Sequence, residues 1–478
     1  MTLLSNAKWN MSSQLFKVMV QAINIIYLAK IIPPSEYGLM AMALVIFNLG
    51  VLLRDLGTSA VIIQRKELTN SLINTVFWLN LLMGIGLALI ITVSAPFIAS
   101  LYHQPKLTNV LMLLSITFPL SSCASAHLAL LERESQFKKV SVIEITSSLA
   151  SVIVAIILAN FGYGVYSLVA QAIVLNMMSA IQFWMASSWR PKMSLFIDMK
   201  ELRNIFGFSA NLSLFNFINY FSRNSDSFII GKFMSSAVLG YYNLAYRIML
   251  FPLQSLSFVA TRSLYPILSK SQDDDEEVLR TYLNCIFIVL MITTPLMSGI
   301  AFYSEPFVRL VIGPQWHLTG DILKWLAPTA IIQAVLSTSG SVFMAKGRTD
   351  ILMRLGIVGT ILQVGSFIIG IRFDITKFAM CYLIANILNF FPVMFFLLRI
   401  INGTLSCFFK KIYAIFVSSF VMIAALTIFN NFYPMVKIIN ILSLVMLCFL
   451  GVIVYSFALF TTSPMVRLAV ISKFSKIK

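Results

Sequence analysis

The chain is an almost unbroken series of apolar segments from Asn10 to Phe460, separated by short polar turns. Each segment is about 20 residues long, the length that a helix needs to cross the hydrocarbon core of a bilayer. Lipid offers no partner to backbone N–H and C=O groups, so segments that span it continuously must be helical. The runs lack the strict apolar–polar alternation of a membrane β-barrel. The sequence therefore predicts an all-α integral membrane protein.

Fourteen segments have the length and hydropathy of transmembrane helices, in a chain that is 59% hydrophobic and 11% charged. We predict them at residues 11–31, 37–57, 72–98, 107–131, 141–160, 165–187, 205–231, 240–264, 282–303, 321–344, 353–371, 377–398, 412–430 and 438–460. The longest polar stretches, 188–204 and 265–281, are too short to fold alone. This leaves no room for a soluble catalytic domain, and we expect no enzyme activity.

The basic residues indicate how the chain crosses the membrane. With the N-terminus in the cytoplasm, and with Lys30, Arg354 and Lys377 at helix ends counted with the adjoining turns, 22 of the 35 Lys and Arg residues fall in cytoplasmic turns and tails and 7 in outer turns. The positive-inside rule favours this orientation and predicts that both termini are cytoplasmic. The net charge of +17 is then a consequence of topology. The cations form no stripe with interleaved aromatic residues, so we expect no nucleic-acid partner.

The sequence shows no motif for a metal, a disulfide or a cofactor. The five cysteines are scattered without a CxxC pair, and the three histidines have no ligand spacing. The acidic run 273–277 resembles the metal-binding motif of a sugar transferase, but no nucleotide-binding domain surrounds it, so we interpret it as a solvated loop. No Walker A loop is present, so ATP bound to this chain cannot power transport.

The chain repeats itself after a shift of 202 residues. Lys30 then falls on Lys232 and Gly38 on Gly240, and in both places a short turn joins two apolar segments. Six helices, an even number, separate the copies, so both copies cross the membrane in the same direction. Parallel bundles of this kind are typical of many alternating-access carriers. We predict six-helix bundles at 1–200 and 201–400, followed at 401–478 by two additional helices and a basic cytoplasmic tail.

Two polar stripes occupy matching positions in the repeat. Their spacings of 3, 4 and 3 residues keep each stripe within about 80° on one side of a helix. The members are Gln14, Lys17, Gln21 and Asn24 in the first helix, and Asn216, Asn219, Arg223 and Asp226 in the seventh. Such faces turn toward a water-filled cavity or toward hydrogen bonds with neighbouring helices. Both interpretations stay open for the Asn and Gln residues, and two matched stripes favour a shared central cavity.

Charged residues within the predicted spans are the next candidates for function. A charge at the bilayer centre costs about 2.5–3.5 kcal/mol on insertion scales, so it is retained where it is needed. Arg223 and Asp226 lie three residues apart on one helix and are able to pair. Arg247 lies two turns into the eighth helix. Asp226 either neutralises Arg223 or has a role of its own, and the spacing does not separate these alternatives.

Several short motifs, in this order, resemble the polysaccharide-export (Wzx-type) flippases of the multidrug/oligosaccharidyl-lipid/polysaccharide superfamily, and most closely the colanic-acid-type exporters. The motifs are EYG at 36–38, DLGTSA at 55–60, GYGVYSLV at 162–169, IIGKF at 229–233, LGYYNLAYR at 239–247, LYPILS at 264–269, GPQW at 313–316 and AKGR at 345–348. The resemblance covers most of the first twelve helices. The last two helices match by hydropathy alone.

The resemblance implies a transporter of the bacterial inner membrane. Members of this family move undecaprenyl-diphosphate-linked oligosaccharide from the inner to the outer leaflet for exopolysaccharide, O-antigen or capsule biosynthesis. Cations in a central cavity are thought to hold the diphosphate, a role that would fall here to Arg223, Arg247 and Lys17. Asn and Gln of the stripes would bind sugar hydroxyls, and Tyr220 or Tyr246 would stack on a sugar ring. The partners implied are the lipid-linked oligosaccharide, the bilayer and other membrane proteins of polysaccharide assembly.

Family carriers are usually proposed to use a proton or sodium gradient, for which Asp226, Asp55 and Glu144 are the acidic candidates. Two rival functions remain. A multidrug antiporter of the same superfamily would favour twelve helices and an acidic, aromatic cavity, whereas the cavity predicted here is cationic. A membrane-embedded polysaccharide polymerase or ligase would carry a large outer loop, and the outer turns here are short.

Overall fold

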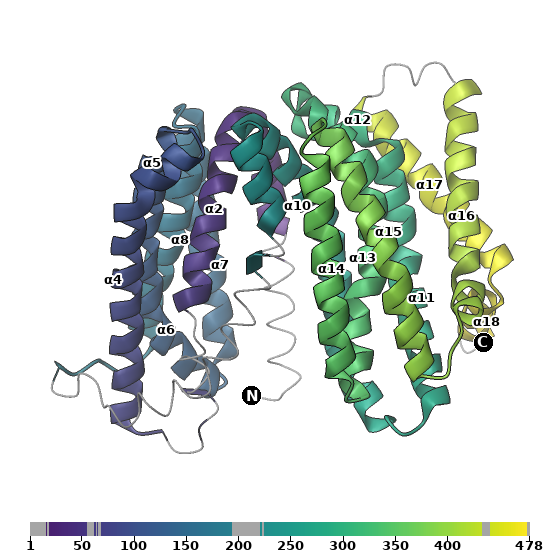
Figure 1. The fold of residues 1–478 in the computed structure, drawn as a ribbon, viewed down its shortest axis with the longest axis horizontal. Coiled ribbons are helices and arrows are strands. Elements are labelled where there is room, and N and C mark those ends of the chain that lie inside the picture. The colour runs from purple at the N-terminus through teal and green to yellow at the C-terminus, as the bar shows by residue number, and fades with distance from the viewer. Residues whose placement is uncertain are drawn as a thin grey trace. The chain divides into compact units, whose positions relative to one another are not determined.

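The computed structural model describes residues 16, 19–54, 62–63, 65, 68–193, 220–221, 224–432 and 440–475, without the side chains of 251–263, 469–470 and 472–475. Within these ranges the chain forms helices joined by turns, with no strand (Figure 1). It divides into two compact units, Met1–Gly240 and Tyr241–Lys478. Helix α10 (Ser236–Lys270) runs through the boundary between them. The predicted division at residues 200 and 400 stays a prediction.

Eleven helices of the described ranges are long and apolar enough to span a membrane, which confirms a multi-pass membrane protein. The spans are α2 (Pro34–Arg54), α4 (Asn70–Leu101), α5 (Lys106–Ser115) with α6 (Thr117–Arg133), α7 (Phe137–Asn160), α8 (Val165–Ala186), α11 (Asp275–Phe302), Pro314–Trp316 with α13 (His317–Ala345), α14 (Thr349–Gly370), α15 (Ile375–Ile400), α16 (Leu405–Phe432) and α17 (Ile441–Thr462). Each coincides with a predicted segment. A shorter apolar helix covers Met19–Ile31. The total of fourteen spans stays a prediction.

In the first unit, α4 packs on α5 and α6, α8 packs on α6 and α7, and α2 lies against α5 and α8. Small residues let these helices approach closely, as is usual in membranes. A Cβ on Gly84 of α4 would lie 2.4 Å from the Ser122 Oγ of α6. The break between α5 and α6 at Ile116 has a local cause, because Pro119 has no N–H to donate to the carbonyl of Ser115.

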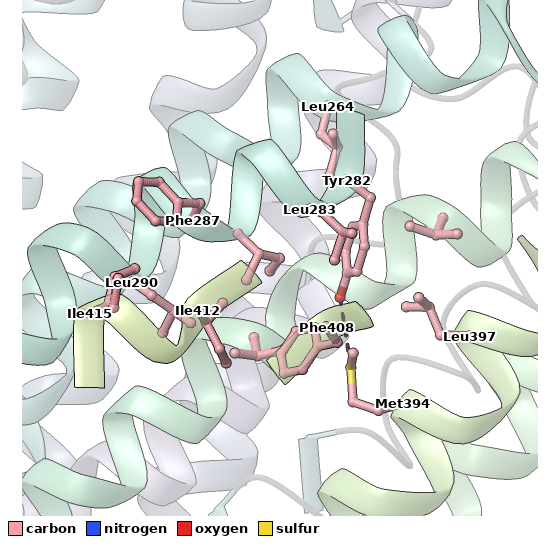
Figure 2. Close-up of a cluster of buried hydrophobic side chains, with 14 of the residues drawn as sticks. Leu264, Tyr282, Leu283, Phe287, Leu290, Met394, Leu397, Phe408, Ile412 and Ile415 are labelled. Carbon is pink, nitrogen blue, oxygen red and sulfur yellow. Dashed lines mark hydrogen bonds between the residues drawn. The ribbon is translucent and has the colours of Figure 1, made fainter. Parts of the chain in front are cut away.

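In the second unit, α13 packs between α11 and α15, and α14 covers α15. A large cluster of buried apolar side chains joins α11, α15 and α16 (Figure 2). Tyr282 is fully buried in this cluster, and its hydroxyl lies 3.8 Å from the Met394 sulfur. Helices α16 and α17 pack on each other and also on α11. The Tyr455 hydroxyl fixes α17 to α11 by donating to the carbonyl of Met291 at 2.9 Å.

The acidic run at 273–277 is largely exposed, as expected, but its last three residues begin a helix instead of lying in a loop. Helix α10 continues to Lys270 and α11 begins at Asp275, so only a short turn separates them. Asp274 caps α11 by accepting a hydrogen bond from the Glu277 N–H at 3.0 Å. Asp275 pairs with Lys346, which also donates to the carbonyl of Gln272. Acidic side chains are favoured in this position because a helix N-terminus carries partial positive charge.

Candidate functional site

Two glycines that are equivalent in the repeat lie where the backbones of α2 and α10 touch. A Cβ on Gly38 would lie 1.6 Å from the carbonyl oxygen of Ser236, and a Cβ on Gly240 would lie 2.0 Å from that of Pro34. The shift of 202 residues that relates Gly38 to Gly240 also relates Pro34 to Ser236. The contact is therefore reciprocal, and we call these four residues the glycine contact. It supports the repeat that the sequence predicts.

Glu36 joins three helices at the end of the first unit that we predict to be outside. Its Oε1 accepts from the Lys106 Nζ of α5 at 3.1 Å, and its Oε2 accepts from the Val165 N–H of α8 at 3.1 Å. The second bond satisfies one of the unpaired donors at the start of α8. Gly164 stands just before it with φ of +52°, a conformation that glycine tolerates best. The EYG and GYG motifs thus meet in space.

Lys232, the repeat equivalent of Lys30, donates from its Nζ to the carbonyl of Leu101 at the C-terminus of α4. A cation at this position complements the partial negative charge of the helix end. Next to it, the Tyr102 ring packs edge-on against Phe228, with ring centres 5.9 Å apart. The segment 224–240 is thereby held to α2 and α4 at the same end as Glu36.

At the other end of the first unit, His127 is fully buried within an aromatic box. The ring centres of Trp184, Trp189 and Phe77 lie 4.8, 5.5 and 6.3 Å from its own. Within the described ranges, neither ring nitrogen has a hydrogen-bond partner. No three His, Cys, Asp or Glu side chains gather there or elsewhere in the described ranges in a way that could hold a metal. In the structure His127 thus packs against three aromatic rings.

The described part of the first polar stripe has two different environments. Asn24 is 4% exposed, and its Nδ2 donates to the Gln171 Oε1 of α8 at 3.3 Å. Gln21, one turn earlier, is exposed. Asn24 thus makes an interhelical hydrogen bond, although its Oδ1 is buried without a partner among the described residues. A role for either side chain in a cavity stays a prediction.

The other described candidates lie on different elements. The Tyr220 hydroxyl donates to the carbonyl of Val45 in α2, so this ring packs against a helix. Asp226 is 2% exposed, and one of its oxygens accepts from the Ser227 N–H at 2.6 Å. Glu144 is half-buried in α7. Arg247 is half-buried in α10, in the second unit. The remaining candidates, Gln14, Lys17, Asp55, Asn216, Asn219 and Arg223, lie outside the described residues.

Sequence reasoning identified the repeat but missed what its residues do. Glu36 and Lys106 were not candidates, because a single acidic residue beside a turn is indistinguishable from a solvated one. The glycine contact carried a signal, since Gly38 and Gly240 align. The contact itself could not be predicted, because the sequence of one helix does not show which of its faces approaches another helix.

The chain is similar in sequence to proteins of polysaccharide biosynthesis. A family model described as a polysaccharide biosynthesis protein matches residues 27–321. The teichuronic acid biosynthesis protein TuaB of Bacillus subtilis is 26% identical over 421 residues, which are 86% of this chain and 85% of TuaB. The lipopolysaccharide biosynthesis protein WzxC of Escherichia coli is 27% identical over 367 residues, which are 77% of this chain and 75% of WzxC.

Among solved structures, the lipid II flippase MurJ in an inward closed conformation matches with a TM-score of 0.74 at 14% identity. The match covers 96% of this chain and 98% of MurJ. At this identity the likeness shows a shared fold. It includes the two C-terminal helices, which the sequence motifs did not reach.

Proposed function

The chain belongs to the polysaccharide biosynthesis protein family, and we propose that it is a flippase for an undecaprenyl-diphosphate-linked oligosaccharide repeat unit. It would move this lipid from the inner to the outer leaflet of the bacterial inner membrane, for the biosynthesis of a surface polysaccharide. Such a protein is a transporter and not an enzyme, since it makes and breaks no covalent bond in its substrate.

The observation that carries this proposal is the match to the family over 27–321 in a chain built almost wholly of membrane-spanning helices. A polysaccharide pathway needs soluble or loop-bearing enzymes for its chemical steps, and no such domain fits into the short turns between the described helices. The step that needs only a membrane-embedded protein is the transfer of the lipid-linked unit between leaflets. The fold shared with a lipid II flippase supports the same step.

The membrane arrangement belongs to the proposal. We infer fourteen spans, arranged as two parallel six-helix bundles around a central cavity with two further helices, and cytoplasmic termini. The substrate passes through the cavity by alternating access. A coupling to a proton or sodium gradient would act through Asp226, Asp55 or Glu144. Other membrane proteins of polysaccharide assembly are the expected partners beyond the lipid itself.

The cavity needs cations because a bare diphosphate in hydrocarbon would cost tens of kcal/mol. We assign Arg223, Arg247 and Lys17 to the diphosphate, since Arg binds phosphate in bidentate geometry and keeps its charge. The amides of the stripes would hydrogen-bond sugar hydroxyls, and Tyr220 would offer an aromatic face. The hydrogen bonds of Asn24 and Tyr220 do not test these roles, because both bonds belong to one conformation of the proposed transport cycle.

The test is genetic and chemical. Deletion of the gene should remove the surface polysaccharide and leave lipid-linked repeat units inside the cell. An enzyme probe is added outside intact spheroplasts, and the repeat units that it cannot reach are then measured in extracts. A panel of cationic drugs serves as the second readout. Unchanged polysaccharide together with drug hypersensitivity would replace the proposal with a multidrug antiporter.

Arg223 offers a sharper test of the cavity. If it binds diphosphate, Arg223→Ala should abolish export at normal protein level, Arg223→Lys should retain part of it, and adding Asp226→Ala should not rescue it. If Arg223 only neutralises Asp226, the double neutral variant should restore export, because the cost of the single variant lies in one orphaned charge. The measurement is surface polysaccharide in a deletion strain, normalised to protein in the membrane.

A further inference from the structure

The last part of the chain carries charge of one sign only. From Ile375 to Lys478 the sequence holds nine Lys and Arg residues and no Asp or Glu. Four of the cations, Arg467, Lys473, Lys476 and Lys478, follow the last membrane span. A run of this length without an acid supplies no counterion of its own to these cations. Cations beside a membrane span are attracted to anionic lipid headgroups.

Three helices of the second unit form a corner where α17 ends. α17 ends at Thr462, and α18 (Pro464–Ser475) begins after Ser463. From α16, the Tyr413 hydroxyl donates to the carbonyl of Thr462 at 3.3 Å. In α18, the Arg467 Nη2 donates to the carbonyl of Thr461 at 2.7 Å. These bonds place the turn of α16 that contains Tyr413 and the first turn of α18 on the same helix end.

Two exposed cations flank this corner. Lys410 lies one turn before Tyr413 and is exposed, and Arg467 lies one turn after Ser463 and is exposed. Lys411 has a different role, because its Nζ donates to the Asn284 Oδ1 of α11 at 2.7 Å. Lys410 and Arg467 are therefore the described cations that can meet a ligand here.

α18 also exposes apolar side chains. Met465, Leu468 and Ile471 are 40%, 68% and 53% exposed, and their spacing of three residues keeps them on one side of the helix. Val466 points the other way and packs on the core cluster of the second unit. A short helix that directly follows a membrane span, with an exposed apolar face and basic residues, is typical of a helix lying in the membrane interface.

We propose that the corner of α16, α17 and α18 binds anionic phospholipid of the leaflet that it faces. Lys410 and Arg467 contact the headgroup phosphate, and Met465, Leu468 and Ile471 lie among the upper acyl carbons. The occupant is a bilayer lipid and not the transported one, since the chemistry required is one negative headgroup beside a shallow apolar face. The inference needs only the membrane location and does not depend on which lipid is transported.

The test uses the purified full-length protein in detergent, incubated with equal amounts of phosphatidylglycerol and phosphatidylcholine of identical acyl chains. Native mass spectrometry counts the lipids that stay bound. We expect the wild type to retain phosphatidylglycerol preferentially. The preference should fall about fivefold for each cation removed, in Lys410→Gln and in Lys410→Gln/Arg467→Gln. Lys377→Gln is the matched control, because Lys377 is an exposed cation of the same acid-free region. Its Nζ lies 3.9 Å from an oxygen of Asp374.

An unchanged preference in Lys410→Gln and in the double variant would overturn the proposal, and so would an equal fall in Lys377→Gln. If the double variant does not fold, Lys410→Gln decides alone, because the described Lys410 side chain is exposed. A competition with undecaprenyl diphosphate addresses the other occupant. Displacement of phosphatidylglycerol by a tenfold smaller amount of that lipid would assign the corner to the transported substrate and reject a bilayer-lipid site.

Discussion

Gly38 illustrates how one absent side chain positions two helices. Any Cβ there would overlap the backbone of Ser236, so α2 and α10 would have to separate. We expect Gly38→Ala to lower the free energy of unfolding by about 1–3 kcal/mol, the usual cost of overpacking. Gly86→Ala is the control, since a Cβ on Gly86 of α4 meets nothing within 4 Å. Thermal unfolding in detergent compares the two, and equal midpoints would contradict the contact.

Glu36 makes two hydrogen bonds that contribute unequally to stability, and single substitutions distinguish the two contributions. Its bond to the Val165 N–H caps α8, and loss of a helix cap costs about 0.5–2 kcal/mol. Its partner Lys106 is 65% exposed, and an exposed ion pair contributes about 0–1 kcal/mol. We expect Glu36→Ala to lower the unfolding midpoint clearly and Lys106→Ala to lower it little. If Lys106→Ala were the more damaging change, the cap would not be what Glu36 supplies.

At the scale of single helices, hydropathy predicted which segments are helical and misplaced some of their ends. α10 extends beyond the predicted 240–264 to Ser236–Lys270, and α11 begins seven residues before the predicted 282. Both errors arise where polar residues continue a helix outside the apolar core, since a hydropathy pattern reports burial in lipid and not helix length. The acidic residues that start α11 could have been recognised as a helix N-terminus, because Asp274 precedes three further acids.

The residue spacing predicted the two polar stripes, but it did not predict what the stripes contact. Asn24 bonds to Gln171 on a helix far along the chain, and the sequence of the first helix holds no sign of that partner. A polar face predicts that lipid is avoided. Whether water or another helix replaces the lipid depends on packing, so the candidate site stays a prediction in its chemistry.

Labelling of the first helix decides whether its polar side meets water. Met19 is 58% exposed and Gln21 is exposed, so exposure alone does not distinguish lipid from water. In a background without the five native cysteines, we expect Gln21→Cys to react with a water-soluble, membrane-impermeant thiol reagent. Met19→Cys should stay unlabelled, because it lies on the apolar side. Equal labelling of both positions would remove the argument for a wet cavity.

For the whole molecule, the sequence predicted the class more reliably than the arrangement. The family resemblance rested on motifs within the first twelve helices, and the family match confirms it over 27–321. Helices α16 and α17 were known only as apolar runs, yet they pack on α11 through Tyr455 and Lys411. Contacts of this kind join residues more than a hundred positions apart, and no local pattern announces them.

Topology is the prediction on which the proposed direction of transport depends. Cytoplasmic termini and fourteen spans follow from the split of 22 cytoplasmic against 7 outer cations. Reporter fusions after Lys106, Lys232 and Tyr303 should therefore read outside, and fusions after Lys139 and Gln272 inside. In the structure Lys106 and Tyr303 lie at helix ends and Gln272 lies in a turn, so fusions there cut no span. Two or more reversed signals would reject this topology, and with it the proposed direction of transport.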